Sequence, residues 1–89
     1  MVTQQQFDEW LVNKDMSTIQ IENGIKVDTS NPWGEIDDDA EFGTIRLIDG
    51  TIHIDWVDSG WNGYGEEQFT DIDEFSTRFT DVMANGLTG

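Results

Sequence analysis

The sequence contains no cysteine, and this absence removes several kinds of chemistry at once. Disulfides, thiolate zinc sites, iron–sulfur clusters and cysteine nucleophiles all require that residue. Histidine is almost as scarce: His53 is the only one, and no Ser or Thr is recognisably placed beside it as a nucleophile. We therefore expect no enzyme activity, no cofactor and no metal centre, and a fold that is held together by packing.

Basic residues are also scarce. Only 4 Lys and Arg accompany 19 Asp and Glu, so the formal net charge is −15. Such a surface repels phosphate backbones and anionic lipid, which argues against direct binding of nucleic acid or membrane and favours a basic protein as partner. Hydrophobic residues make up 36% of the chain and aromatics 11%, more than an acidic disordered tail contains. The 89 residues therefore predict a single acidic α+β domain over 1–89.

Long apolar runs are missing as well. No stretch approaches the about 18 apolar residues of a membrane span. The first residues have neither the positive segment nor the apolar run of a signal peptide. These features predict a cytoplasmic location, which is the host cytoplasm if a phage encodes the chain.

Two segments have the apolar spacing of helices. Thr3 and Gln6 have the spacing of a capping box, and the apolar residues that follow predict a helix over 4–14. The second helix is expected to start near Thr70 or Asp71 and to stop at Asn85-Gly86. Its apolar side holds Ile72, Phe75, Phe79, Val82 and Met83, and a separate stripe holds Asp71, Glu74, Arg78 and Asp81.

Between the helices, apolar and polar residues alternate as in two β-hairpins. For the first, a three-residue loop, 22–24, is expected to pair Ile21 with Ile25. It also pairs Ile19 with Val27. For the second, a two-residue Asp49-Gly50 turn pairs the 44–47 segment with 52–55. The segments 29–41 and 58–65 are interpreted as loops. The expected fold is α+β: a two-layer, four-stranded antiparallel sheet flanked by N- and C-terminal helices, in the order α-β-β-β-β-α.

The acids are concentrated in 35–41, in 55–67 and on the outer stripe of the last helix. Helix-dipole stabilisation explains only the acids in the first turns of that helix. We predict that the others bind a partner, with Trp61 and Tyr64 as anchors. For Trp33, Trp61 and Tyr64 alike, a lid on the core stays open as the alternative to an anchor. The predicted partner-binding residues are Glu35, Asp37, Asp38, Asp39, Glu41, Asp55, Asp58, Trp61, Tyr64, Glu66 and Glu67.

A calcium loop is a weaker interpretation of the same region. Asp55, Gly60 and Glu66 stand at positions 1, 6 and 12 of the EF-hand pattern. Position 3 is Val57, which has no side-chain oxygen, and the segment that enters the loop has the pattern of a strand. A metal site is therefore not predicted here.

The size, the charge and the loop-borne acids resemble the small acidic inhibitors with which phages mimic DNA and block host restriction enzymes or RNA-guided nucleases. One stretch is closer: Gly60-Trp61-Asn62, then Tyr64, Glu66-Glu67 and Phe69 ahead of an acidic final helix resembles a segment of a compact α/β inhibitor of the type II-A CRISPR nuclease. The resemblance implies carboxylates that take the place of a protospacer-adjacent motif or a phosphate backbone.

On this basis we expect a phage or mobile-element inhibitor of a host defence nuclease, of the anti-CRISPR type. It is expected to bind the basic nucleic-acid groove as a DNA mimic. Three alternatives stay open: an acidic immunity or adaptor protein that neutralises a basic partner, a CRISPR inhibitor that acts away from the DNA site, and an adaptation to high salt.

Overall fold

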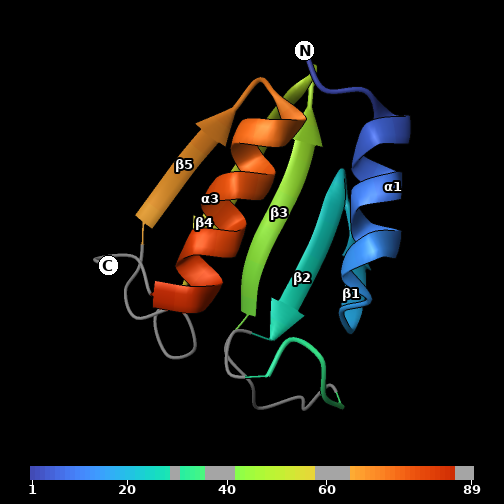
Figure 1. The fold of residues 1–89 in the computed structure, drawn as a ribbon. Coiled ribbons are helices and arrows are strands. Elements are labelled where there is room, and N and C mark those ends of the chain that lie inside the picture. Colours follow the sequence, from blue (N-terminus) through green and yellow to red (C-terminus); the bar gives the residue numbers. More distant parts are fainter. Residues whose placement is uncertain (29–30, 36–41, 58–64, 86–89) are drawn as a thin grey trace.

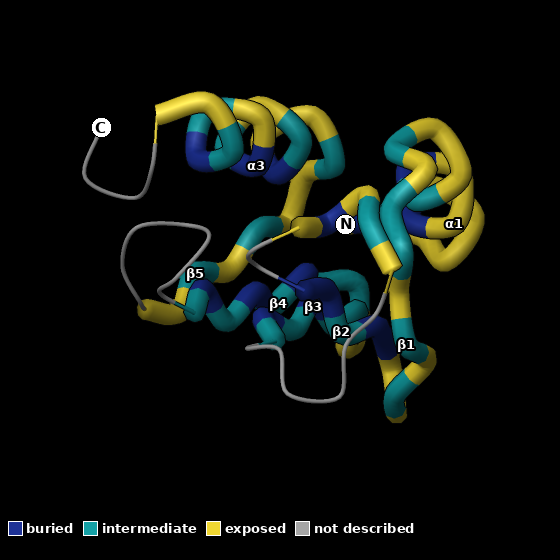
Figure 2. The backbone as a smooth tube through the Cα atoms, turned by 90° about the horizontal axis from the view of Figure 1, so that it is seen from below, coloured by how far each residue is buried: buried dark blue, intermediate teal, exposed yellow. Residues whose placement is uncertain are grey.

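Two helices and five strands make up the computed structural model, which describes residues 1–28, 31–35, 42–57 and 65–85. The elements, in chain order, are α1 (Gln4–Lys14), β1 (Thr18–Ile21), β2 (Gly24–Asp28), β3 (Phe42–Ile48), β4 (Thr51–Trp56), β5 (Gly65–Phe69) and α3 (Ile72–Asn85). The strands form one antiparallel sheet in the order β1-β2-β3-β4-β5. Both helices lie on the same side of this sheet (Figures 1 and 2). The predicted α+β class is confirmed.

The predicted capping box starts α1. The Thr3 hydroxyl accepts a hydrogen bond from the Gln6 amide at 3.1 Å, and the Gln6 side-chain oxygen accepts one from the Thr3 amide at 3.0 Å. The helix ends at Asp15, whose left-handed backbone (φ 54°) stops the hydrogen-bond ladder. Phe7 and Trp10 are buried under it, so the prediction of a helix over 4–14 is confirmed.

The last helix also starts as predicted. The Asp71 carboxylate accepts hydrogen bonds from the amides of Asp73 (2.7 Å) and Glu74 (3.4 Å), which is the geometry of an N-cap. Its apolar side packs onto the sheet, with Phe75, Phe79 and Val82 buried.

The second hairpin has the predicted register. Asp49 and Gly50 both have positive φ, 51° and 81°, as a two-residue type I′ turn requires. The turn pairs Ile45 with Ile54 and Arg46 with His53. Alternation then places one row of side chains toward the helices and the next row on the opposite side of the sheet.

The predicted register of the first hairpin is wrong. The turn has two residues, Glu22 and Asn23, so Ile21 pairs with Gly24, and Ile19 pairs with Lys26. Asn23, with φ 63°, takes the left-handed position of this turn. Gly24 serves a different need, because a Cβ there would collide with the backbone of the neighbouring strand β3. The isoleucines of β1 therefore face away from the helices.

The sheet has five strands and not the four that were expected. β5 pairs with β4 and places Phe69 beside Ile52 and Glu67 beside Ile54. Its sequence, Gly-Glu-Glu-Gln-Phe, contains one apolar residue, and a single apolar residue cannot show the two-residue period of a strand. Gly65, which was assigned to the preceding loop, is the first residue of β5.

The core lies between the helices and the facing side of the sheet. Trp10, Trp56, Phe75 and Phe79 form a continuous aromatic cluster, with ring centroids 4.6 to 6.2 Å apart in its neighbouring pairs. The buried hydrophobic residues are Val2, Phe7, Trp10, Ile25, Val27, Ile45, Ile52, Ile54, Trp56, Phe75, Phe79 and Val82. Within the described residues, neither helix has the length and apolar character needed to cross a bilayer.

Antiparallel topology separates the two ends of the sheet. β2 ends opposite the start of β3, and β4 ends opposite the start of β5, at the same end. α3 also ends there (Figure 1). The two tight turns and the starts of both helices lie at the other end.

Candidate functional site

The helix layer, defined as α1 and α3 with their cap residues Asp15 and Asp71, carries the largest excess of acids in the described structure. Seven acids stand on it against two bases. The bases are Lys14 and Arg78. The acids are Asp8, Glu9, Asp15, Asp71, Asp73, Glu74 and Asp81, of which all but Asp81 are exposed.

Both bases of the helix layer are engaged. The Arg78 guanidinium donates from Nε to both carboxylate oxygens of Glu67 at 3.1 Å and from Nη1 to Asp81 at 3.3 Å. The Lys14 ammonium lies 5.7 Å from the centre of the Trp10 ring and 5.9 Å from that of Phe79, in the range of a cation–π contact. Lys14 and Arg78 therefore do not neutralise the exposed acids of the helix layer.

A groove of about 300 Å³ brings acids of the two helices together. Glu9 of α1 and Asp73 of α3 line it, with Trp10 and Ser76 between them. The Trp10 indole N–H donates to the Ser76 hydroxyl at 3.3 Å, which links the helices at this point. Sequence periodicity predicted the acid stripe of the last helix alone; the groove depends on how α1 packs beside α3, which one-dimensional patterns do not contain.

The predicted site residues that the structure describes do not form one cluster. Glu35 is exposed and follows the Pro32–Gly34 turn. Asp55 and Glu66 are register partners on β4 and β5, on the side of the sheet away from the helices. Asp55 accepts a hydrogen bond from the Thr44 hydroxyl at 3.0 Å and lies 3.6 Å from the Arg46 guanidinium.

Glu67 has a structural position that the sequence analysis missed. Its side chain lies on the helix side of β5 and is one-third exposed. It accepts a hydrogen bond from the Trp56 indole N–H at 2.6 Å and is paired with Arg78. Its carboxylate thus ties β4 and β5 to α3. The alternation that places Phe69 on the core side would have placed Glu67 there too, had β5 been recognised.

The other predicted site residues lie outside the described residues: Asp37, Asp38, Asp39, Glu41, Asp58, Trp61 and Tyr64. The segment 36–41 joins the sheet at Phe42, and the segment 58–64 joins it at Val57 and Gly65, at the same end of the sheet. The attachment points of the two acidic segments are therefore neighbours.

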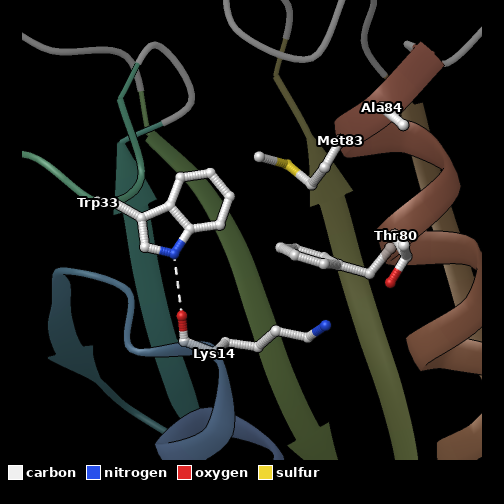
Figure 3. Close-up of a pocket in the computed structure, with 6 residues that line it drawn as sticks. Lys14, Trp33, Thr80, Met83 and Ala84 are labelled. Atoms are coloured by element: carbon white, nitrogen blue, oxygen red, sulfur yellow. Dashed lines mark hydrogen bonds between the residues drawn. The ribbon is translucent and has the colours of Figure 1, made fainter.

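Trp33 closes one end of the space between the helices. Its indole N–H donates to the Lys14 carbonyl at 2.9 Å. Together with Lys14, Phe79 and Met83 it lines a pocket of about 280 Å³ (Figure 3). The ring is nevertheless 55% exposed, so it covers the core and also presents a large apolar surface to solvent.

Among the described residues, no group of three or more His, Asp or Glu side chains is placed to hold a metal ion. The central part of the EF-hand-like pattern, 58–64, lies outside those residues. Comparisons with models of protein families, with curated proteins and with solved structures returned no match. Functional inference therefore rests on the surface itself.

Proposed function

We propose that this protein is a phage or mobile-element inhibitor of a host defence nuclease, of the anti-CRISPR type, which binds the basic nucleic-acid groove as a DNA mimic. It acts by stoichiometric binding and not as an enzyme. The observation that carries the proposal is the helix layer: seven acids on two packed helices, with both bases of the layer engaged by Glu67, Asp81 and aromatic rings.

The rigidity of this layer supports mimicry. Carboxylates on helices are held at fixed separations, and Glu74 and Asp81 are seven residues apart on α3, about 10 Å along the axis at ~1.5 Å per residue. Phosphates follow one strand of B-DNA at about 3.4 Å per step along its axis. Glu74 and Asp81 thus span roughly three phosphate steps, and Glu9 adds a second acidic row across the groove from α3.

The predicted acids of 35–41 and Asp58 remain part of the proposal. Glu35 and the acids of 37–41 and 58 follow or precede strand ends that are neighbours in the sheet. Asp55 and Glu66 lie on the opposite side of the sheet from the helices, and Asp55 is 3.6 Å from the Arg46 guanidinium, so we leave both out of the groove-binding surface. Glu67 is left out because both of its carboxylate oxygens accept hydrogen bonds from Arg78, one of them also from Trp56, and its side chain is one-third exposed. Asp81 is kept because its side chain is 45% exposed and accepts from Arg78 at Oδ2.

An order-of-addition cleavage assay tests the proposal. A type II-A CRISPR nuclease loaded with guide RNA receives the protein either before or after its target DNA, and cleavage is measured. Strong inhibition is expected when the protein is added first and little when DNA already fills the groove. Raising the salt concentration weakens the inhibition, because charge pairs steer and stabilise the complex.

Two double variants test whether the acids of the helix layer are the ones that bind the nuclease. Glu9→Gln/Glu74→Gln removes two charges from the helix layer, and we expect inhibition to weaken about tenfold, or ~1.4 kcal/mol. The matched control, Glu22→Gln/Asp49→Asn, removes two charges from the tight turns and is expected to inhibit like the parent protein. Asn is well suited to the left-handed position of residue 49.

Other outcomes would overturn parts of the proposal. Inhibition that is indifferent to the order of addition would mean an inhibitor that acts away from the DNA site. Absence of inhibition, combined with tight capture of a basic toxin encoded beside the gene, would favour an immunity protein. A chain that unfolds at low salt would instead point to adaptation to high salt.

A further inference from the structure

The open face of the sheet, defined as the side turned away from the helices, has a different charge pattern from the helix layer. No described element covers it (Figure 2). Two of the four Lys and Arg residues of the chain, Lys26 and Arg46, stand on it, beside the only histidine. It also holds apolar side chains, among them Ile48, which is 38% exposed.

The charges on the open face are divided across the sheet. One row of paired residues runs from β1 to β5 and reads Ile19, Lys26, Thr44, Asp55, Glu66. The bases lie on β2 and β3, and the exposed acids on β4 and β5. Lys26 and Glu66 are three strand spacings apart, about 14 Å at ~4.8 Å per spacing. The structure shows no ion pair between them, and the Lys26 ammonium lies 5.6 Å from the centre of the Phe42 ring.

This division makes the face complementary to itself. A two-fold axis that runs parallel to the strands, between β3 and β4, lays β2 of one copy over β5 of another. Lys26 of each copy then lies against Glu66 of the other, and the middle of the row brings Thr44 against Asp55. Packed sheets of this kind align their strands within about 30°, which keeps the rows in register.

Electrostatics also selects this face over the rest of the surface. Two molecules of charge −15 repel each other, and contact through the helix layers would bring their acids together. Contact through the open faces directs both helix layers outward. We propose that the occupant of the open face is a second copy of this chain, held in a two-fold dimer by reciprocal Lys26–Glu66 pairs.

The size of the face sets the expected affinity. Five strands of four to seven residues give a face of about 19 by 20 Å, on the order of 400 Å² per copy. The two copies together would bury on the order of 800 Å², which is less than the about 1,000 Å² that a stable specific interface needs. The dimer is therefore a weak one, and sedimentation equilibrium over roughly 10 to 500 μM is the appropriate range of measurement.

Charge reversal tests the dimer. The parent protein is expected to show an average mass that rises with concentration from 10.1 kDa toward twice that value. Lys26→Glu alone and Glu66→Lys alone are each expected to stay at the monomer mass throughout this range. The double variant, Lys26→Glu/Glu66→Lys, restores both pairs with their signs exchanged and is expected to associate again.

Mixing the two single variants gives the sharper result. A Lys26→Glu chain offers two acids and a Glu66→Lys chain offers two bases at the paired positions. The mixture should therefore form a one-to-one heterodimer at concentrations where each variant alone is monomeric, and native mass spectrometry distinguishes the two chains. Circular dichroism of each variant reports whether its fold is intact, and the mixing result does not depend on any nuclease.

Matched changes elsewhere provide the control. Glu9→Lys changes the charge by the same amount as Glu66→Lys but on the helix layer. Asn13→Asp/Thr77→Glu adds the same negative charge there as Lys26→Glu. Both are expected to associate like the parent protein. A parent protein that stays monomeric up to 500 μM, or single variants whose mixture stays monomeric, would overturn the dimer.

Discussion

The two sides of the one sheet differ in what their side chains do. On β4, Ile52, Ile54 and Trp56 point to the helices and are at most 1% exposed. His53 and Asp55 alternate with them on the open face and are partly exposed. The helix side thus holds the apolar contacts that stabilise the fold, and the open face is free to vary in chemistry because little of the core depends on it.

The outer surfaces of the molecule differ in the same way. The helix layer is predominantly acidic, and its two bases are engaged by Glu67, Asp81 and aromatic rings. The open face has both signs of charge, arranged in two halves. A surface of one sign suits a basic partner, whereas a divided surface suits a copy of itself, and the two proposals above rest on this difference.

The largest effect is expected from truncating a buried side chain on the helix side of the sheet. Ile54→Ala removes a fully buried side chain between β3, β5 and the helices, and such truncations cost about 2–5 kcal/mol of unfolding free energy. His53→Ala, one residue away on the open face, is expected to change it by less than about 0.5 kcal/mol. Urea unfolding of the two variants measures the difference. Equal losses would mean that the open face is part of a packed core.

Two of the glycines in the sheet, Gly24 and Gly65, are expected to respond differently to substitution. Gly24→Ala places a Cβ against the β3 backbone at Ile45 and Arg46, and we expect a loss of about 1–3 kcal/mol from the displaced strand pairing. Gly65→Ala meets no atom within 4 Å and has no positive φ, so it is expected to be nearly neutral. Urea midpoints report both. A neutral Gly24→Ala would show that the first hairpin has another register.

Neighbouring glutamates on β5 provide the next test. Glu67→Gln weakens the bonds to Arg78 and Trp56, and hydrogen bonds of charged groups in such positions contribute about 1.5–3 kcal/mol, of which we expect 1–2 to be lost. Glu66→Gln, on the open face, is expected to leave stability within about 0.5 kcal/mol. Thermal and urea unfolding at low protein concentration check the pair. Equal effects would contradict the assignment of Glu67 to the helix side.

The smallest effect is expected at the start of α3. Asp71→Ala removes the acceptor for the amides of Asp73 and Glu74 and should cost about 1 kcal/mol. Asp71→Asn keeps an acceptor oxygen and should recover most of that loss. If the Asn variant is as unstable as the Ala variant, Asp71 stabilises the fold through its charge and not through its N-cap hydrogen bonds.

Much of the fold could be predicted because local chemistry determined it. The Thr3–Gln6 capping box and the Asp49-Gly50 turn are set by residues close in sequence, and they predicted α1 and the β3–β4 register correctly. The first hairpin was misread because its isoleucines were assumed to share a face. The requirement for a side-chain-free residue at Gly24 comes from β3, a strand distant in sequence.

The candidate site was less predictable for the same reason. β5 is a strand because β4 offers it an edge, and Glu67 has partners because α3 lies above it. The helix-layer groove lies where Trp10 of α1 donates a hydrogen bond to Ser76 of α3, and these two residues are 66 positions apart in the sequence. Charge composition predicted an acidic surface but not which acids share a face.

The absence of cysteine allows the two surfaces to be probed one at a time. A single cysteine introduced by Thr77→Cys reports on the helix layer, and one introduced by Gln68→Cys reports on the open face, through their rates of alkylation. We predict that a guide-loaded type II-A nuclease slows alkylation at position 77, and that target DNA bound to the nuclease beforehand prevents this protection. Position 68 is expected to respond only to the concentration of the protein itself. Protection of position 68 by the nuclease, with position 77 still reactive, would contradict the account.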